Sequence, residues 1–168
     1  MSKYGNSRAK EKVELISSHI SILDSKDRLT IRCKFNFHYF NVQKASQDFS
    51  DWTHPQLIEL LTKLKAFSED SLEKWATKKL GNSVGHVLEV YDYFPNMDKT
   101  DFIEPKNIPI EVKWARFRLD SNTRVVGFVV SDEYHDRAHE RTGVRFDKNT
   151  FYVVFLDANH KFYKTEKK

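Results

Sequence analysis

The sequence predicts an α+β fold, in which an antiparallel sheet of four or more strands is packed by a helical hairpin. Three observations support this prediction. Apolar and polar residues alternate from Leu29 to Tyr39, which is the period of a half-buried strand. Apolar residues recur at helical spacing between residues 53 and 81, and three strand patterns follow between residues 112 and 156. Helical patterns therefore come early and strand patterns late, as is typical of α+β proteins.

Composition indicates one globular domain with a core. The chain has 168 residues, of which 39% are hydrophobic and 31% charged, and this balance excludes a disordered polymer. We predict a single domain over residues 28–168, preceded by a tail and helix over residues 1–27. A net charge of +4 permits an anionic partner such as nucleic acid without requiring one.

The single cysteine, Cys33, excludes an intramolecular disulfide and suits a reducing compartment. The first residues lack the apolar run of a signal peptide, and no segment approaches the roughly 20 apolar residues of a membrane span. We therefore expect a cytoplasmic protein with no membrane partner. Cys33 lies on the apolar side of its strand pattern, where a buried and unreactive thiol is the default.

The N-terminal half is predicted to contain three helices and one strand. Residues 9–23 form an amphipathic helix with apolar residues at helical spacing. The strand over residues 29–39 follows, and its polar side carries three candidate nucleic-acid contacts, which are Arg32, Lys34 and His38.

Residues 53–81 predict the helical hairpin. Thr53 is suited to the N-cap and Pro55 to the first turn of its first helix. Gly81 is suited to the C-cap of the second. Residues 82–110 form a less regular segment: residues 85–94 fit either a short strand or a helical turn, and a proline-containing loop follows.

Three strands are predicted in the C-terminal half, over residues 112–119, 123–130 and 150–156. A tight turn joins the first two, and an irregular charged segment, residues 131–149, joins the last two. A turn at residues 157–159 and a short return strand at residues 160–164 are expected to end the domain.

The arginines of these strands are the first candidate site. Arg116 and Arg118 lie two residues apart on one strand and project from the same face, and Arg124 opens the neighbouring strand. Three guanidinium groups on one face can bind phosphate groups bidentately. Alternatively, nearby carboxylates such as Glu111 and Asp120 pair with them, and the face is only solvated.

His160 and Tyr163 form the second candidate. A histidine at the end of a buried strand can carry protons near neutral pH, and a tyrosine can bind a phosphate or stack on a base. The alternative is an ordinary hairpin, in which Asp157 and Asn159 make the turn and Phe162 enters the core.

The segment 131–149 contains His135, Asp136, His139 and Glu140. Two histidines four residues apart share a face on a helix, as metal ligands do. The glutamate is misplaced for the H-E-x-x-H pattern and no third ligand is evident. A charged, solvated loop is the favoured interpretation, and we predict no metal site.

Several C-terminal motifs resemble those of the RelE/ParE superfamily of bacterial toxins. The motifs are "WARFRL", "TRVVGF" and "FYVVFLDANHKFY". From Arg28 to Tyr163 the predicted order of strand, helical hairpin and three antiparallel strands is also similar to that family. In the family the second strand often has a basic pair, the third often opens with arginine, and the last often runs into a histidine with a tyrosine shortly after. The present chain is longer, with extra segments at residues 1–27, 82–110 and 131–149.

The resemblance implies an endoribonuclease of toxin–antitoxin type that uses no metal or other cofactor. RNA, free or on the ribosome, would be cut through attack of a 2′-OH on the adjacent phosphate, and an antitoxin protein would be the partner. On this chain, His160 would be the general acid or base and Tyr163 would orient or stack. Arg116, Arg118 and Arg124 would bind the phosphate, and Lys161 and Lys164 would contact the RNA.

Two alternatives stay open. The first is a non-enzymatic module that binds nucleic acid or a protein through the basic sheet face. It predicts salt-sensitive binding without cleavage. The second is a metal-dependent nuclease that uses His135, Asp136 and His139, and it predicts loss of activity with a chelator.

Overall fold

The computed structural model describes residues 8, 10–14, 22, 28–81 and 85–164. The chain divides into two units, Met1–Ile31 and Arg32–Lys168, which are described separately. In the first unit, residues 8 and 10–14 are helical and exposed, so the described start of the predicted helix is helical. Ile22 lies in a turn, and the other residues of that prediction fall outside the described ranges.

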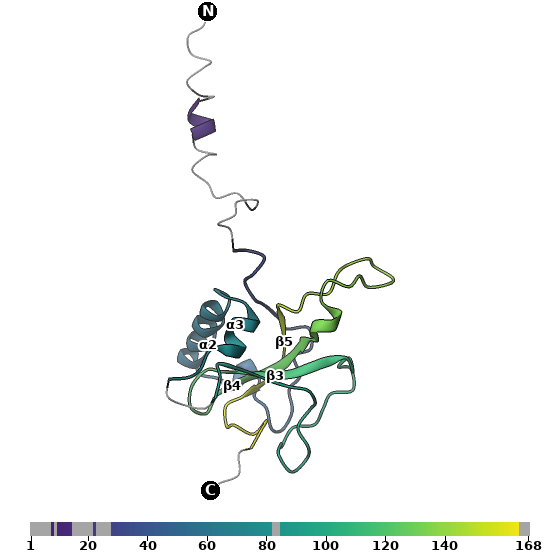
Figure 1. Cartoon of the computed structure of the whole chain (residues 1–168). Coiled ribbons are helices and arrows are strands. Elements are labelled where there is room, and N and C mark those ends of the chain that lie inside the picture. Colours follow the sequence, from purple (N-terminus) through teal and green to yellow (C-terminus); the bar gives the residue numbers. More distant parts are fainter. Residues whose placement is uncertain (1–7, 9, 15–21, 23–27, 82–84, 165–168) are drawn as a thin grey trace, which may run out of the picture. The chain divides into compact units, whose positions relative to one another are not determined.

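The second unit is built on one five-stranded sheet (Figure 1). The strand order is β1-β5-β4-β3-β2, in which β1 is parallel to β5 and every other pair is antiparallel. The α+β class is confirmed, but the sheet is mixed rather than purely antiparallel. The reason is that β1 and β5 are joined by the rest of the domain, so no tight turn forces them to run in opposite directions. The strands are β1 Lys34–Asn36, β2 Leu88–Tyr91, β3 Val112–Arg118, β4 Arg124–Val130 and β5 Thr150–Asp157.

β1 is much shorter than the strand predicted over residues 29–39. It pairs with β5 only from Lys34 to Asn36. Several apolar residues of the alternating pattern are uncovered: Leu29 is 55% exposed, Ile31 47% and Phe37 39%. A turn in which the Phe40 N–H donates to the Phe37 carbonyl then bends the chain away. The alternation therefore extends beyond the residues that find a partner strand.

The helical hairpin is confirmed as α2 (His54–Phe67) and α3 (Leu72–Thr77). Thr53 is the N-cap of α2, with Pro55 in the first turn, as predicted. The prediction of Gly81 as the second C-cap is wrong, because α3 ends at Thr77 and Lys78 caps it. The chain after α3 instead pairs with the approach to β2: the Leu80 N–H donates to Gly85 and the Val87 N–H to Lys78.

The two segments without a clear secondary-structure prediction contain short regular elements. The open choice at residues 85–94 is settled by β2, which is a strand. Residues 131–149 begin with a short 3₁₀ helix, Asp132–Tyr134, and continue into a hairpin-like loop that projects from the sheet (Figure 1). Over the described residues, no helix is long and apolar enough to cross a membrane.

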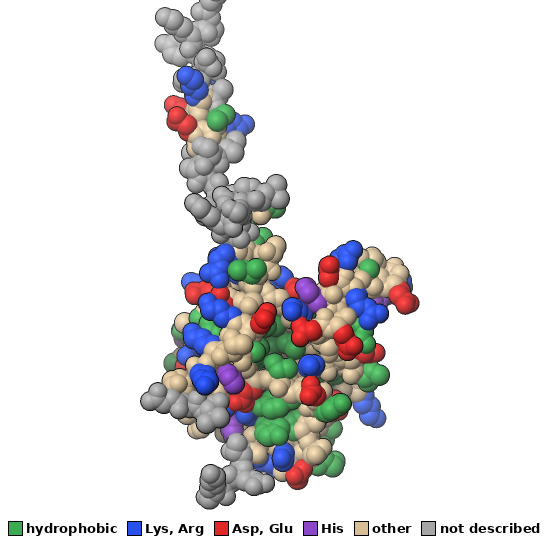
Figure 2. Space-filling model, viewed as in Figure 1, with side chains coloured by type: hydrophobic (Ala, Val, Ile, Leu, Met, Phe, Trp, Pro, Cys, Tyr) green, Lys and Arg blue, Asp and Glu red, His purple; other side chains and the backbone are tan. Residues whose placement is uncertain are grey.

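The surface mixes charge with exposed apolar groups. Acidic and basic side chains are interspersed on the face shown in Figure 2, and hydrophobic side chains remain exposed between them. The segment between β2 and β3 contributes four of the most exposed, and these are Tyr93, Met97, Ile103 and Ile110.

Two hydrophobic cores lie on opposite faces of the sheet. The helix-side core joins α2 and α3 to alternate residues of β3, β4 and β5, including Phe117, Val125 and Phe151. The second core contains Trp114, Val126, Phe128, Phe155 and Phe162. The prediction that Arg116 and Arg118 share one face of β3 is confirmed, because both pair with Glu89. The alternate residues Ala115, Phe117 and Leu119 face the helix-side core.

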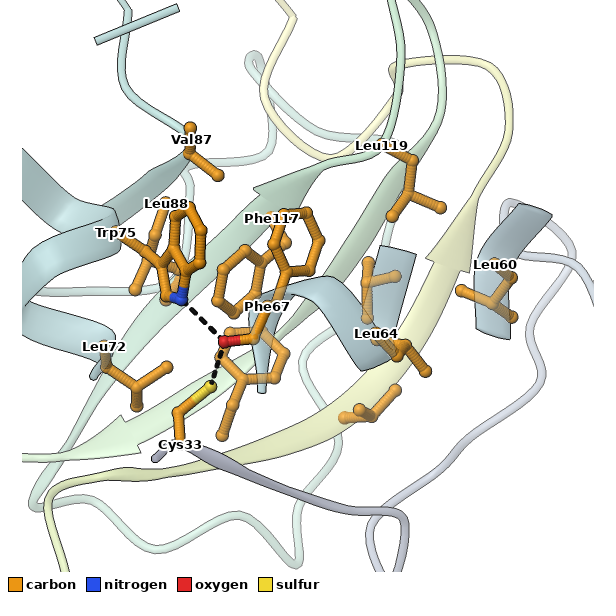
Figure 3. Packing of buried hydrophobic residues seen from close by; sticks show 14 of the residues in the cluster. Cys33, Leu60, Leu64, Phe67, Leu72, Trp75, Val87, Leu88, Phe117 and Leu119 are labelled. Atoms are coloured by element: carbon orange, nitrogen blue, oxygen red, sulfur yellow. Dashed lines mark hydrogen bonds between the residues drawn. The ribbon is translucent and has the colours of Figure 1, made fainter. Parts of the chain in front are cut away.

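The Phe67 carbonyl links both helices to the start of β1 (Figure 3). It accepts hydrogen bonds from the Cys33 thiol at 3.1 Å and from Trp75 Nε1–H at 2.7 Å. Cys33 is buried, as its place in the pattern predicts, and burial raises the pKa of its thiol to about 12. The thiol is therefore protonated at neutral pH and serves as a hydrogen-bond donor within the core.

Gly127 lies at a β-bulge where β4 meets β5. A Cβ atom there would lie 1.9 Å from the Tyr152 carbonyl oxygen, so the backbones could not keep this spacing. We expect Gly127→Ala to lower the free energy of unfolding by about 3 kcal/mol in a urea titration. Gly143→Ala is the control. Gly143 has open space around it and only a φ of 67° to disfavour alanine, so its loss should be about 1 kcal/mol. Equal losses would contradict the crowding argument.

Candidate functional site

The predicted arginines meet on the sheet face opposite the helices. Register pairs Glu89 with Arg116, Arg118 with Arg124, and Arg124 with Asp157, so four strands contribute to one area. The turn after β5 brings His160 and Tyr163 to the same area. We call these residues the arginine cluster: Glu89, Arg116, Arg118, Arg124, Asp157, His160 and Tyr163.

Arg116 is the centre of the cluster and is 3% exposed. Its Nε–H and Nη2–H donate to Glu89 Oε2 at 2.9 and 2.6 Å. Its Nη1 lies 3.2 Å from His160 Nε2 and 3.3 Å from the Tyr163 carbonyl oxygen, to which it donates. Because a guanidinium only donates, the contact with His160 requires Nε2 to accept. This buried charge therefore joins β2, β3 and the C-terminal turn.

Two tyrosines flank the Arg116 guanidinium. The rings of Tyr91 and Tyr163 stack 4.9 Å apart at an angle of 7°. The guanidinium carbon lies 5.6 Å from the first ring and 5.7 Å from the second, within cation–π range. The Tyr91 hydroxyl also donates to Glu89 at 2.8 Å. Burial, above all, raises the pKa of Tyr91, so the hydroxyl stays a donor.

Glu89 is the functional candidate that the sequence did not indicate. Besides Arg116, it accepts a hydrogen bond from Arg118 Nη2 through its other oxygen. Burial alone would raise its pKa, but Arg116, Tyr91 and Arg118 together outweigh burial and lower the pKa to about 2. The predicted carboxylate partners, Glu111 and Asp120, are not the ones that pair with Arg116 and Arg118. Glu89 escaped detection because the register of β2 on β3 cannot be inferred from either strand alone.

Arg124 caps the turn between β3 and β4. Its guanidinium donates to the carbonyls of Asp120, Ser121 and Thr123 at 2.8 to 3.0 Å. Burial, followed by the positive charges of Arg116 and Arg118, lowers its pKa to about 10. Its proximity to two further cations is therefore unfavourable, and only part of that repulsion is relieved by Asp157.

Asp157 shapes the turn that contains His160. It is fully buried, and its carboxylate accepts N–H groups from Asn159, Lys161 and Phe162 at 2.8 to 3.1 Å. The return strand predicted over residues 160–164 is wrong, because these donors bond to Asp157 rather than to a neighbouring strand. Of the hairpin alternative, the turn made by Asp157 and Asn159 and the entry of Phe162 into the core are confirmed, but no second strand forms.

His160 is held by this turn in a left-handed backbone conformation, with φ 54°. Burial, followed by the charges of Arg124 and Arg116, lowers its pKa below the usual 6.5. Asp157 acts in the opposite direction but does not outweigh them. The imidazole is therefore neutral at pH 7, in agreement with an Nε2 that accepts from Arg116.

The charges of the cluster do not balance. Three guanidinium groups face two carboxylates, and one of these, Asp157, also serves four backbone hydrogen bonds. The Nε–H groups of Arg118 and Arg124 are buried and have no hydrogen-bond partner among the described residues. Arg118 is the accessible arginine, with 23% of its side chain exposed. An anion at Arg118 would offset the excess positive charge.

The predicted nucleic-acid contacts outside the cluster are dispersed. Lys34 faces the opposite end and edge of the sheet, pairs with Thr150 and forms an ion pair with Asp147 at 2.5 Å. Arg32 and His38 are exposed beside it. Lys34 is thus separated from Asp157, at the other end of β5, by seven residues of that strand, or about 23 Å.

Lys161 and Lys164 lie on the C-terminal turn, near the cluster. The Lys164 Nζ donates to Asp101 at 2.8 Å, an ion pair exposed to solvent. The Lys161 carbonyl accepts from Asp101 N–H, which fastens the turn to the segment before β3. Tyr163 stacks on Tyr91 rather than facing outward alone.

The histidines of the projecting loop do not share a helix. His139 pairs with Val144 across the loop, and the His135 ring accepts from the Lys148 N–H at 3.4 Å. Within the part of the chain that the structure describes, no three His, Cys, Asp or Glu side chains gather as a metal site.

Comparison of the chain with protein-family models, with curated proteins and with solved structures gave no match. The resemblance to the RelE/ParE toxins therefore stays an expectation from the sequence.

The low pKa of Glu89 makes stability depend on acid pH. Glu89 contributes to the free energy of unfolding above pH 4.5, the pKa of its carboxyl group in the unfolded chain. This contribution is lost as the pH falls towards about 2, the pKa of the same group in the folded protein. Between pH 5 and pH 2, the wild type should lose about 3 kcal/mol more unfolding free energy than Glu89→Gln. Urea titrations across this range measure the difference. Glu59→Gln, an exposed change on α2, should follow the wild type, and parallel curves for wild type and Glu89→Gln would refute the ion-pair account.

Proposed function

We propose that this protein is a metal-independent endoribonuclease of toxin–antitoxin type, with the arginine cluster as its active site. The observation that carries the proposal is a neutral imidazole in contact with an excess of guanidinium groups. Cleavage through a 2′-OH requires a proton acceptor and cations that stabilise the charge on phosphorus. His160 would be the acceptor, and its Nε2 lies 3.2 Å from Arg116 Nη1. Arg116 and Arg118 would be the cations, and Glu89 holds them together by a hydrogen bond to each.

Arg118 and Arg116 would bind the non-bridging oxygens of the scissile phosphate. An arriving phosphodiester competes with Glu89 for their N–H groups and supplies the negative charge that the cluster lacks. When the phosphate accepts from Arg116 Nη1–H, His160 Nε2 loses its donor and its lone pair becomes available. Binding the substrate thereby prepares the base.

The net reaction transfers one proton from the 2′-oxygen to the 5′-oxygen and replaces one bond to phosphorus with another. His160 Nε2 takes the proton of the 2′-OH as the 2′-oxygen forms its bond to phosphorus. The bond from phosphorus to the 5′-oxygen breaks, and that oxygen takes a proton from water. The products are a 2′,3′-cyclic phosphate and a 5′-OH, and His160 returns its proton to the solvent.

Glu89 has a positioning role in this proposal. Its two oxygens bind Arg116 and Arg118 separately, which fixes the distance between the two guanidinium groups. With a pKa of about 2 it is ionised at neutral pH and is a poor proton donor. The stacked pair of Tyr91 and Tyr163 would keep the Arg116 side in place while Arg118 meets the substrate. As a toxin, the protein would be neutralised by an antitoxin that covers the arginine cluster with acidic groups.

Cleavage of RNA in excess EDTA tests the proposal. The wild type should leave 2′,3′-cyclic phosphate ends, and His160→Asn should lower the rate by about 100-fold or more. Asparagine is chosen because it tolerates the left-handed backbone of this position. His38→Asn, an exposed histidine away from the cluster, should cleave at the wild-type rate. Both free RNA and translating ribosomes are tried as substrates.

An intact fold without cleavage of either RNA by the wild type would sink the proposal and favour a non-enzymatic binding role. Activity that is abolished by EDTA and restored by a divalent metal would favour the metal-dependent alternative instead. Unchanged cleavage by His160→Asn would remove His160 from the mechanism.

The pH dependence of the rate provides a separate check. Because the pKa of His160 is lowered, its base form is present at pH 7 and the rate should fall only on the acidic side of 6.5. The quantity measured is kcat/KM from pH 4.5 to pH 8, because its pH dependence reports the pKa of His160 in the free protein, before a bound phosphate raises it. An acidic limb that begins above pH 7 would show that His160 is not the base in the form described.

A further inference from the structure

A groove lies on the same face of the sheet as the arginine cluster. It has a volume of about 560 Å³ and is lined by residues of the segments 92–94 and 104–114. The aromatic, charged and apolar side chains that could contact a ligand there include Tyr93, Phe94, Glu104, Lys106, Ile110 and Trp114.

The groove and the cluster are built on the same pair of strands. Glu89 pairs with Arg116 at one position, and Tyr91 pairs with Trp114 one step further along. Trp114 and Arg116 lie two residues apart on one face of β3, which separates their Cα atoms by about 7 Å. Phe162 packs on Phe94 and Trp114, and Tyr163 stacks on Tyr91, so the C-terminal turn lies between the cluster and the groove. A chain bound at Arg118 would cross this turn to place a base in the groove.

The walls of the groove suit a flat ring. Phe94 and Trp114 pack edge to face with ring centroids 4.8 Å apart, and Trp114 is only 2% exposed, so this pair forms the floor of the groove and leaves stacking to Tyr93. Tyr93 is 83% exposed and Ile110 is 93% exposed, although both are large apolar groups. Exposed aromatic side chains beside a phosphate-binding site are the usual stacking surfaces for the bases of single-stranded RNA.

The polar groups of the groove favour one base. Trp114 Nε1–H donates to Glu104 Oε1 at 3.1 Å, which fixes the carboxylate against the wall. A carboxylate has about four acceptor positions, so Glu104 can accept further hydrogen bonds. Guanine presents two adjacent donors, N1–H and N2–H, beside the O6 acceptor. Adenine, cytosine and uracil each present a donor beside an acceptor that would face the carboxylate.

We propose that this groove binds a guanine base of the RNA whose scissile phosphate lies at the arginine cluster. Glu104 accepts from N1–H and N2–H, Lys106 donates to O6, and Tyr93 stacks on the ring. The inference rests on the proposed function, because it takes RNA as the substrate, but the binding of a guanine nucleotide can be measured without cleavage.

The indole N–H resonances of the three tryptophans provide the test. Guanosine 5′-monophosphate is added to the full-length protein, and ¹H–¹⁵N spectra are recorded. The Trp114 indole signal should shift and saturate, because its acceptor is Glu104. The Trp75 signal should not move, since its indole donates to Phe67 in the core on the other face. Adenosine, cytidine and uridine monophosphates should bind at least about 10-fold more weakly.

Glu104→Gln keeps an acceptor for Trp114 but replaces one carboxylate oxygen with a donor, so it should abolish the preference for guanine. Glu59→Gln, on α2, should leave the preference unchanged. Equal binding of all four nucleotides, no shift of the Trp114 signal, or an unchanged preference in Glu104→Gln would each overturn the inference.

Cleavage assays separate this inference from the proposed function. If RNA is cleaved with no enrichment of guanine at the cut sites and no preference among the mononucleotides, the groove assignment fails and the endoribonuclease stands. If no RNA is cleaved but guanosine monophosphate shifts the Trp114 signal selectively, the endoribonuclease fails and the guanine site stands.

Discussion

The buried guanidinium of Arg116 is the interaction on which the site and much of the surrounding structure depend. A charge that is only 3% exposed is costly unless it is paired and hydrogen-bonded. Its partners come from separate parts of the chain: Glu89 from the edge strand β2, and His160 and the Tyr163 carbonyl from the C-terminal turn. Arg116 is buried and paired only when both parts are in place, so the hydrogen bonds of this one side chain bring Glu89, His160 and Tyr163 together.

The three arginines differ in their hydrogen-bond partners and in their exposure to solvent. In the free protein Arg116 donates to Glu89, His160 and the Tyr163 carbonyl. Arg124 caps the turn between β3 and β4. Arg118 shares Glu89 with Arg116 but keeps 23% of its side chain exposed, so under the proposed function it is the arginine that a ligand would contact first. Preorganised cations of this kind need little rearrangement when charge develops on a bound phosphate. The same packing lowers the pKa of His160 and gives a base that is neutral at physiological pH.

Local patterns predicted the parts of the fold that depend on a single element. Period-two alternation placed Arg116 and Arg118 on one face of β3, and capping chemistry located the start of α2 at Thr53. The parts that depend on pairing between distant elements were missed. Glu89 became a partner of the arginines only through the register of β2 on β3, and β1 proved parallel to β5. The predicted return strand failed because Asp157 binds the backbone donors that a strand would have used.

The central claim is that the imidazole of His160 is neutral in the free protein and lies in a cluster whose excess positive charge a bound anion would offset. The most direct measurement is the pKa of its imidazole by NMR titration, with the signal assigned by comparison with His160→Asn. The account predicts a pKa below 6.5 in the free protein and a higher one in the presence of inorganic phosphate, because a bound anion stabilises the imidazolium. A pKa at or above 6.5 that phosphate does not change would contradict it.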